Sequence, residues 1–163
     1  MTLRSHFLLA CAITLLLGAS AGQCRDISFQ SIAKAAPLGS EPPQPILYIA
    51  TSVEDAERFL PWLEAEHQKA VRANDWGERV VVAVFRGAVG TNGFGITVRR
   101  LRVEHDRLRL IVVFHDPPPQ SMARPAFTTP YHIIALPKRS FATSMPASWI
   151  LENSQRQILA QKP

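Results

Sequence analysis

Four strand-like runs of mainly apolar residues occupy the middle of the chain. The run Val80–Phe85 is apolar at every position, which is typical of a central strand that is covered on both faces. In the runs 96–103 and 108–114 apolar residues recur at every second position, and Gly- and Pro-rich segments connect the runs. The four runs span residues 80–85, 96–103, 108–114 and 131–136, and a shorter run of strand formers occupies residues 46–50. This pattern predicts a small β-rich domain.

The alternation changes phase within the second run. Ile96 and Val98 share one parity, whereas Leu101 and Val103 share the other. Since successive side chains of a strand point to opposite faces, one extra residue at 99–100 would return both pairs to the same face. The sequence therefore predicts a β-bulge at this position.

An amphipathic helix is predicted between Thr51 and Gly77, before the central strands. Thr51 and Ser52 are each followed three residues later by a carboxylate, which is the spacing of a capping box. Apolar residues then recur at helical spacing, and Pro61 should kink the helix or start a second one. The expected fold class is α+β: a mainly antiparallel β-sheet, as a small sandwich or an open barrel, with one N-terminal capped helix packed on it.

The two ends of the chain differ from this middle part. Arg4, the apolar run Phe7–Leu17 and the small residues that follow have the plan of a secretory signal peptide. The expected organisation is a signal peptide at 1–23, a linker at 24–45, the main domain at 46–139 and a tail at 140–163. The tail could form a frayed helix between residues 146 and 161.

Cys24 is the only cysteine that follows the apolar leader. An unpaired cysteine in an exported protein needs a reason, and lipidation of Cys24 is one. Cleavage after Ala21 without lipidation is the alternative, because Gln23 is unusual directly before a lipidated cysteine. We expect export to the periplasm or cell envelope, and the lipid anchor stays open.

Composition and residue spacing do not indicate catalysis. The net charge of +5 is modest, and no nucleic-acid-binding motif accompanies it. No histidine stands at metal-ligand spacing from another histidine or a cysteine, and no serine lies in a glycine-flanked elbow. We therefore expect no enzyme activity, metal or cofactor, no nucleic-acid partner, and membrane contact only through a lipid anchor. A hydrolytic enzyme would instead need convergent polar groups near His132 or His115.

A glycine-punctuated loop at residues 90–95 is the candidate binding element. Asn92-Gly93 favours a primed turn in a β-hairpin, and the loop lacks the lysine and the following helix of a phosphate-binding loop. Phe94 could be an exposed anchor that fills a partner's pocket, or it could point into the core. The candidate binding residues are Thr91, Asn92, Gly93 and Phe94.

Five arginines occupy the two strands that follow this loop. They could form the solvated, aggregation-resistant face of amphipathic strands, which is the favoured interpretation. They could also attract an acidic protein surface or anionic lipid. The five are Arg99, Arg100, Arg102, Arg107 and Arg109.

The order of these elements resembles the C-terminal domain of PrcB-type protease-complex lipoproteins. The resemblance covers roughly residues 46–138 and rests on five segments that occur in family order. They are Asn74-Asp-Trp-Gly77, the strand 80–85 with Gly87, the turn Thr91-Asn-Gly-Phe94, the Pro117-Pro-Pro119 break and Thr129-Pro-Tyr-His-Ile-Ile-Ala-Leu-Pro137. The family turn is usually Thr-Gly-Gly-Tyr, so Asn92 and Phe94 depart from it.

The resemblance implies an exported, often lipid-anchored, non-catalytic partner that stabilises or assists a cell-surface protease. The turn is also distantly similar to the Thr-Thr-Gly-Tyr/Phe loop of chagasin-like inhibitors of cysteine proteases. Protease inhibition is therefore the alternative function, and a hydrolytic enzyme is a weaker one.

Overall fold

The computed structural model describes residues 24–122, 124–141 and 144–163. The predicted signal peptide, 1–23, lies outside these residues. None of the helices in the described ranges is long and apolar enough to cross a membrane.

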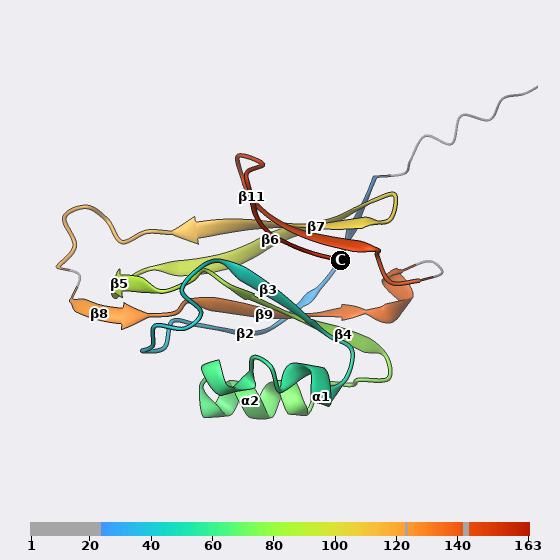
Figure 1. Cartoon of the computed structure of the whole chain (residues 1–163), viewed down its shortest axis with the longest axis horizontal. Coiled ribbons are helices and arrows are strands. Elements are labelled where there is room, and N and C mark those ends of the chain that lie inside the picture. Colours follow the sequence, from blue (N-terminus) through green and yellow to red (C-terminus); the bar gives the residue numbers. More distant parts are fainter. Residues whose placement is uncertain (1–23, 123, 142–143) are drawn as a thin grey trace, which may run out of the picture.

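Two β-sheets face each other and form a sandwich (Figure 1). The first sheet has the strand order β1-β6-β7-β10-β11, and the second has the order β2-β9-β4-β3. The first consists of β1 (Arg25–Ile27), β6 (Gly95–Glu104), β7 (Arg107–His115), β10 (Ser148–Asn153) and β11 (Ile158–Lys162). The second consists of β2 (Gln30–Ala35), β9 (Tyr131–Pro137), β4 (Arg79–Phe85) and β3 (Ile46–Ala50). The sheets do not close into a barrel, so of the two predicted forms the sandwich is the one observed.

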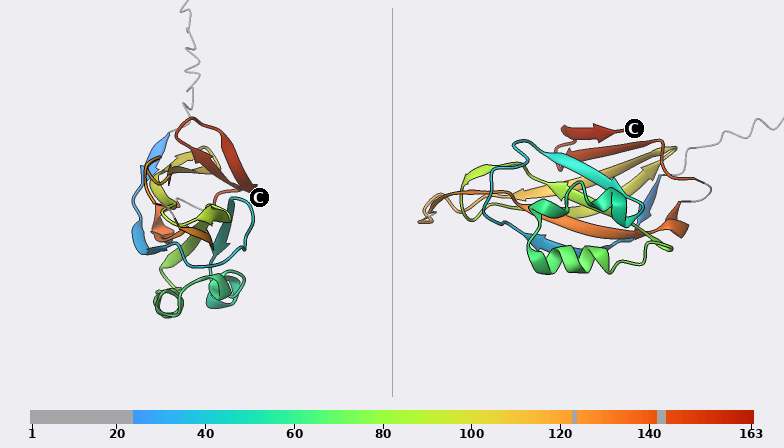
Figure 2. Two further views of the ribbon diagram at one scale, coloured as in Figure 1. Left: turned by 90° about the vertical axis from the view of Figure 1, so that its left-hand side faces the viewer. Right: turned by 60° about the horizontal axis from the view of Figure 1, so that its bottom comes forward.

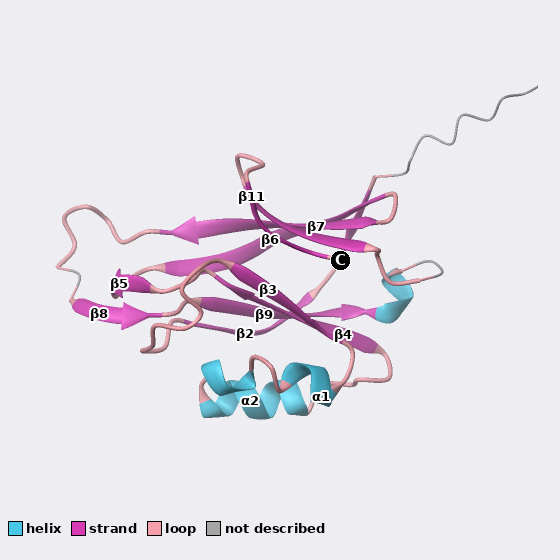
Figure 3. Ribbon diagram, viewed as in Figure 1, coloured by secondary structure: helices cyan, strands magenta, loops and turns pink. Residues whose placement is uncertain are grey.

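Helical segments cover the outer face of the second sheet (Figures 2 and 3). They are α1 (Val53–Ala56), a 3-10 turn (Leu60–Trp62) and α2 (Ala65–Arg72), and a second 3-10 turn (Lys138–Ser140) follows β9. The predicted helix is thus two short helices, and the chain breaks near Pro61. Proline removes a backbone donor and crowds the preceding turn, which explains the position of the break.

Strand β4 lies at the centre of the core. The even-numbered side chains from Val80 to Val84 pack between the two sheets, and the odd-numbered ones from Val81 to Phe85 pack under the helices. All six are fully buried. The prediction of a central strand covered on both faces is confirmed, and its uniform apolar sequence follows from having a hydrophobic layer on each side.

The bulge predicted in β6 is also present. The register between β6 and β7 shifts between Val98 and Arg100. As a result Val98 and Leu101 both pack into the core between the sheets, and the arginines of β6 lie on the outer face. The extra residue in β6 thus explains the phase change in the sequence.

The segment predicted as a linker contains two strands that join the two sheets. β1 pairs with β6 in the first sheet, and β2 pairs with β9 in the second. Ile27 and Ala33 are buried along this segment. The strands are too short to show a clear alternation in the sequence, and the pairing across long sequence distances stabilises them.

The frayed helix predicted between residues 146 and 161 is wrong. This segment forms β10 and β11, and β10 pairs in parallel with β7. Trp149 and Leu151 alternate into the core between the sheets, which requires a strand. The parallel partner, β7, lies about 40 residues earlier in the chain, so the local sequence does not indicate this pairing.

Candidate functional site

A two-stranded arm extends from one end of the sandwich (Figure 1). It consists of β5 (Val89–Thr91) and β8 (Pro125–Thr128), which pair antiparallel. The predicted hairpin through Asn92 and Gly93 is therefore wrong in its pairing, because β5 pairs with β8 and not with the strand that follows the turn. Gly93 has φ +91°, whereas Asn92 keeps a negative φ, so the turn is not the primed type that needs both.

Two hydrogen bonds between Asn92 and Arg124 account for this pairing. The Asn92 N–H donates to the Arg124 carbonyl oxygen at 3.1 Å, and the Arg124 N–H donates to Asn92 Oδ1 at 2.9 Å. Gly93 packs beside Pro117, where a Cβ at residue 93 would lie 3.0 Å from the Pro117 Cβ. The turn 91–94 is thus held against the segment that follows β7, and Thr91 accepts a long hydrogen bond of 3.5 Å from the Thr128 hydroxyl.

Phe94 is half-buried and belongs to a stack of side chains at the base of the arm. The Arg86 guanidinium lies over the Phe94 ring at 4.6 Å and over the Phe114 ring at 4.7 Å. Arg86 also pairs with Asp116 at 2.6 Å and donates to the His115 carbonyl oxygen at 2.8 Å. One face of Phe94 is therefore covered by a fixed cation, and the ring is neither fully exposed nor part of the apolar core.

The most exposed apolar side chains of this end lie outside the turn, in β8 and in the segments next to it. Met122 is fully exposed, at 100%, and Phe127 on β8 is 66% exposed. Leu38, which bridges to β8 opposite Thr128, is 81% exposed. None of these three side chains was among the binding residues predicted from the sequence. Their signal was the presence of large apolar residues in a segment otherwise rich in turn formers.

The comparisons with known proteins bear on the strands that frame this arm. The model of the family described as PrcB C-terminal matches residues 80–137. We call residues 80–137, which match this family model, the PrcB C-terminal segment. The comparison with curated proteins found no match, nor did the comparison with solved structures. The predicted family is thus confirmed over β4 to β9, and the match indicates a PrcB-like accessory domain.

The structure explains two of the residues on which the family resemblance rests, Gly87 and Pro117. Gly87 has φ +93°, and a Cβ there would lie 2.8 Å from the backbone carbon of Gln44. Any side chain at residue 87 would therefore clash with the backbone of the segment that leads into β3. The Pro117 end of the proline run supports the turn through Gly93, as described above.

Tyr131 ties the PrcB C-terminal segment to the helices. Its ring is fully buried, and its hydroxyl accepts a hydrogen bond from the Glu64 N–H at 3.2 Å. The hydroxyl proton remains for His67 Nδ1, which lies at 2.7 Å. Burial raises the pKa of Tyr131, so the hydroxyl stays protonated and can make both bonds. Tyr131 is therefore a core residue whose hydroxyl has two polar partners.

His67 also lies close to two carboxylates, a grouping that sequence spacing did not reveal. Single ligand atoms from Glu64, Glu66 and His67 lie within 4.8 Å of one another. Both glutamates are exposed, and His67 Nδ1 already faces the Tyr131 hydroxyl. His67 Nδ1 also lies 3.6 Å from a Glu64 carboxylate oxygen, and Nε2 lies 3.5 Å from a Glu66 carboxylate oxygen.

His132 is the candidate for catalysis that the sequence left open, and it is buried at 3% exposure. The Val98 N–H donates to His132 Nδ1 at 2.8 Å, and Ser31 Oγ lies 2.8 Å from Nε2. Burial, and then the charge of Lys34, lowers the pKa of His132 from its ordinary 6.5 to about 4. The ring is therefore neutral at neutral pH.

The hydrogen bond from β6 also fixes which nitrogen of His132 carries the proton. Since Nδ1 accepts from the Val98 N–H, the proton of the neutral ring resides on Nε2 and is donated to Ser31 Oγ. A histidine that activates a serine must accept the hydroxyl proton on that nitrogen. The Ser31–His132 contact thus has the wrong tautomer for a general base, and it acts instead as a bond between β2, β9 and β6.

The arginines of β6 and β7 gather on the outer face of the first sheet. Here a groove of about 380 Å³ is lined by Arg100, Arg102, Arg109 and Arg156 together with Glu104 and Glu152. We call it the arginine groove. Its centre is Arg109, which pairs with both glutamates at 2.8 Å. These pairs hold the pKa of Glu104 below its usual range, so both the acid and the arginine stay charged.

The lipidation candidate Cys24 lies at the margin of the arginine groove. Its side chain is exposed, and Sγ is 3.8 Å from Glu104 Oε1. The chain therefore enters the domain beside this groove, through β1 at the edge of the first sheet.

Proposed function

We propose that this chain is an exported, non-catalytic accessory domain that binds a protease of the cell envelope. The PrcB C-terminal match over residues 80–137 supports the accessory role. The apolar leader supports export. The tautomer of His132 supports a non-catalytic role, since the serine–histidine contact of the domain is arranged for structure.

The arm is the observation that carries the protein-binding part of this proposal. Phe127 and Met122 expose large apolar side chains, which cost solvation free energy unless a partner covers them. Aromatic side chains on rigid supports are typical anchors at protein interfaces, and methionine adapts to irregular surfaces. The Asn92–Arg124 bonds provide that rigidity.

The four turn residues have a supporting part in this proposal. Thr91, Asn92 and Gly93 shape the arm, and Phe94 fixes its base through Arg86. The partner would contact the arm at Phe127, which is exposed. Phe94 then contributes through its exposed edge and through the position of the arm.

The proposal is tested by capturing partners from envelope extracts with the purified chain. Phe127→Ala should reduce the captured protease about tenfold or more, as expected for an aromatic anchor. Ile158→Ala is the matched control, because Ile158 is a similarly exposed apolar residue, at 55%, on β11. Equal capture by the Phe127→Ala variant and the parent would show that the arm is not the binding surface.

A purified papain-like protease separates the accessory role from the inhibitor alternative. An accessory domain leaves its activity unchanged at micromolar concentration, whereas a chagasin-like inhibitor slows it. The lipid anchor at Cys24 is a separate question, and mass spectrometry of the N-terminal peptide of the mature chain decides between the two cleavage sites.

A further inference from the structure

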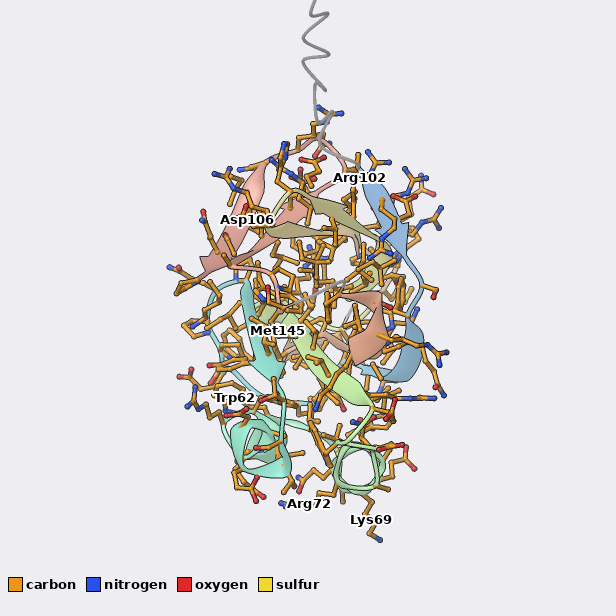
Figure 4. All side chains as sticks on the ribbon, turned by 90° about the vertical axis from the view of Figure 1, so that its right-hand side faces the viewer. Trp62, Lys69, Arg72, Arg102, Asp106 and Met145 are labelled. Atoms are coloured by element: carbon orange, nitrogen blue, oxygen red, sulfur yellow. The ribbon has the colours of Figure 1, made fainter. Side chains whose placement is uncertain are left out.

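Charge is distributed unevenly across the sandwich. The helical segment 51–78 contains seven acidic and three basic residues, whereas residues 95–115, which form β6 and β7, contain five arginines and two acidic residues. The helices and the β6–β7 sheet lie on opposite sides of the molecule. Figure 4 shows Arg102 at one end of this axis and Lys69 and Arg72, on α2, at the other. The molecule thus has a basic face and an acidic face.

The basic face retains cationic groups after its internal ion pairs are counted. Arg109 occupies both carboxylates of the arginine groove. Arg102 and Arg100 share the single carboxylate of Asp26, at 3.0 and 3.4 Å, and the Arg100 side chain is 55% exposed. Arg156 forms no ion pair with any described residue, and it lines the same groove. Guanidinium groups remain available at the open side of the groove.

The face has a defined relation to the start of the domain. Exposed Cys24 lies against Glu104, which lines the groove. Whatever precedes residue 24, whether an apolar leader or a lipid on Cys24, joins the domain on its basic side. The acidic helices lie on the far side.

We propose that the outer face of β6 and β7 docks on an anionic membrane surface, with Arg100 and Arg156 of the arginine groove binding lipid headgroup phosphates. Planar guanidinium groups match phosphate oxygens in a bidentate geometry, and basic residues near a membrane are attracted by its negative surface potential. The acidic helices then face away from the membrane, because that orientation lowers the electrostatic free energy. This proposal rests on the export part of the proposed function and is independent of protease binding.

The position of Cys24 favours a membrane over an acidic protein as the occupant. A protein ligand could approach the groove from any direction, whereas a membrane that holds the chain at residue 24 necessarily lies near this face. The arm projects from an end of the sandwich, so it stays accessible to a protein partner while the basic face is covered (Figure 1).

Vesicle sedimentation with the chain from residue 24 onward, carrying Cys24→Ser, tests the proposal without a lipid anchor. This chain contains every helix and strand of the described residues. It should bind vesicles of phosphatidylglycerol mixed with phosphatidylcholine and fail to bind pure phosphatidylcholine. Arg100→Gln/Arg156→Gln should weaken binding about 25-fold, since each basic residue near an anionic surface contributes about fivefold.

Arg58→Gln/Lys69→Gln is the matched control. It removes the same two charges from exposed positions in the acidic helical layer, and it should bind as the parent does. Equal losses for both double variants would mean that net charge alone drives binding, which overturns the proposal. Absence of parent binding to the anionic vesicles, or preference for soluble poly-glutamate over them, would overturn it as well.

The two proposals fail separately in these assays. The Phe127→Ala variant should lose the protease and keep vesicle binding, whereas Arg100→Gln/Arg156→Gln should do the reverse. A parent chain that captures the protease and does not bind the anionic vesicles would refute the membrane proposal alone.

Discussion

Acid should destabilise this domain through His132. The ring is neutral in the folded state, with a pKa of about 4, against 6.5 for an unperturbed histidine. Between these values the unfolded chain binds a proton that the folded chain excludes, so the free energy of unfolding falls as the pH drops. Above pH 6.5 the neutral ring makes its full contribution to the free energy of unfolding. This contribution decreases as the pH falls and stops decreasing below about pH 4, where the folded ring also binds a proton.

The size of the effect follows from the two pKa values. If the whole shift in the pKa of His132 acts on stability, the free energy of unfolding falls by about 2 kcal/mol between about pH 7.5 and about pH 5. Ser31, the partner of Nε2, is exposed on the edge strand β2, so solvent screens part of the penalty. We expect a loss of about 1–2 kcal/mol over this interval.

Urea unfolding at a series of pH values measures this loss, with His132→Gln and His115→Gln as comparisons. The parent and the His115→Gln control, altered at an exposed histidine, should lose stability in parallel. The His132→Gln variant should lose about 1–2 kcal/mol less, because glutamine does not titrate. Identical pH profiles for the parent and His132→Gln would refute the neutral buried ring, as would an NMR titration of His132 near its ordinary pKa.

Substitutions at two further residues test the contacts around the arm and helices. Tyr131→Phe removes the buried hydroxyl that joins β9 to the start of α2, and it should lower the free energy of unfolding by about 1–2 kcal/mol; an unchanged urea midpoint would show that these hydrogen bonds do not form. Phe94→Ala removes the ring that covers Arg86 and should cost about 1–2 kcal/mol, whereas Phe94→Tyr keeps the stack and should cost less than about 0.5 kcal/mol. If Phe94→Ala leaves stability unchanged and abolishes partner capture, Phe94 is an anchor and the stack is unimportant.

The candidate site was only partly accessible from the sequence. The turn 91–94 stood out because glycine and asparagine mark positions that need special backbone geometry. The turn's partner, Arg124, is 32 residues from Asn92, and the sequence around Asn92 does not indicate this contact. Phe127 and Met122 were passed over because exposure depends on which neighbours the fold supplies, and a single apolar residue in a loop can be buried or exposed.

The sequence by itself determined those features that depend on the chain's own periodicity. The uniform apolar run of β4 requires a hydrophobic layer on each face, and the phase change at Arg99–Arg100 requires an extra residue in β6. Only the tertiary structure decided which strands pair across long sequence distances. The sequence around Trp149 is compatible with a helix or a strand, and the parallel pairing with β7 decides for the strand. His132 is enclosed by the core and accepts a hydrogen bond from the Val98 N–H, and neither feature is evident from the local sequence. Pairing and burial are properties of contacts between distant segments, so the local pattern does not contain them.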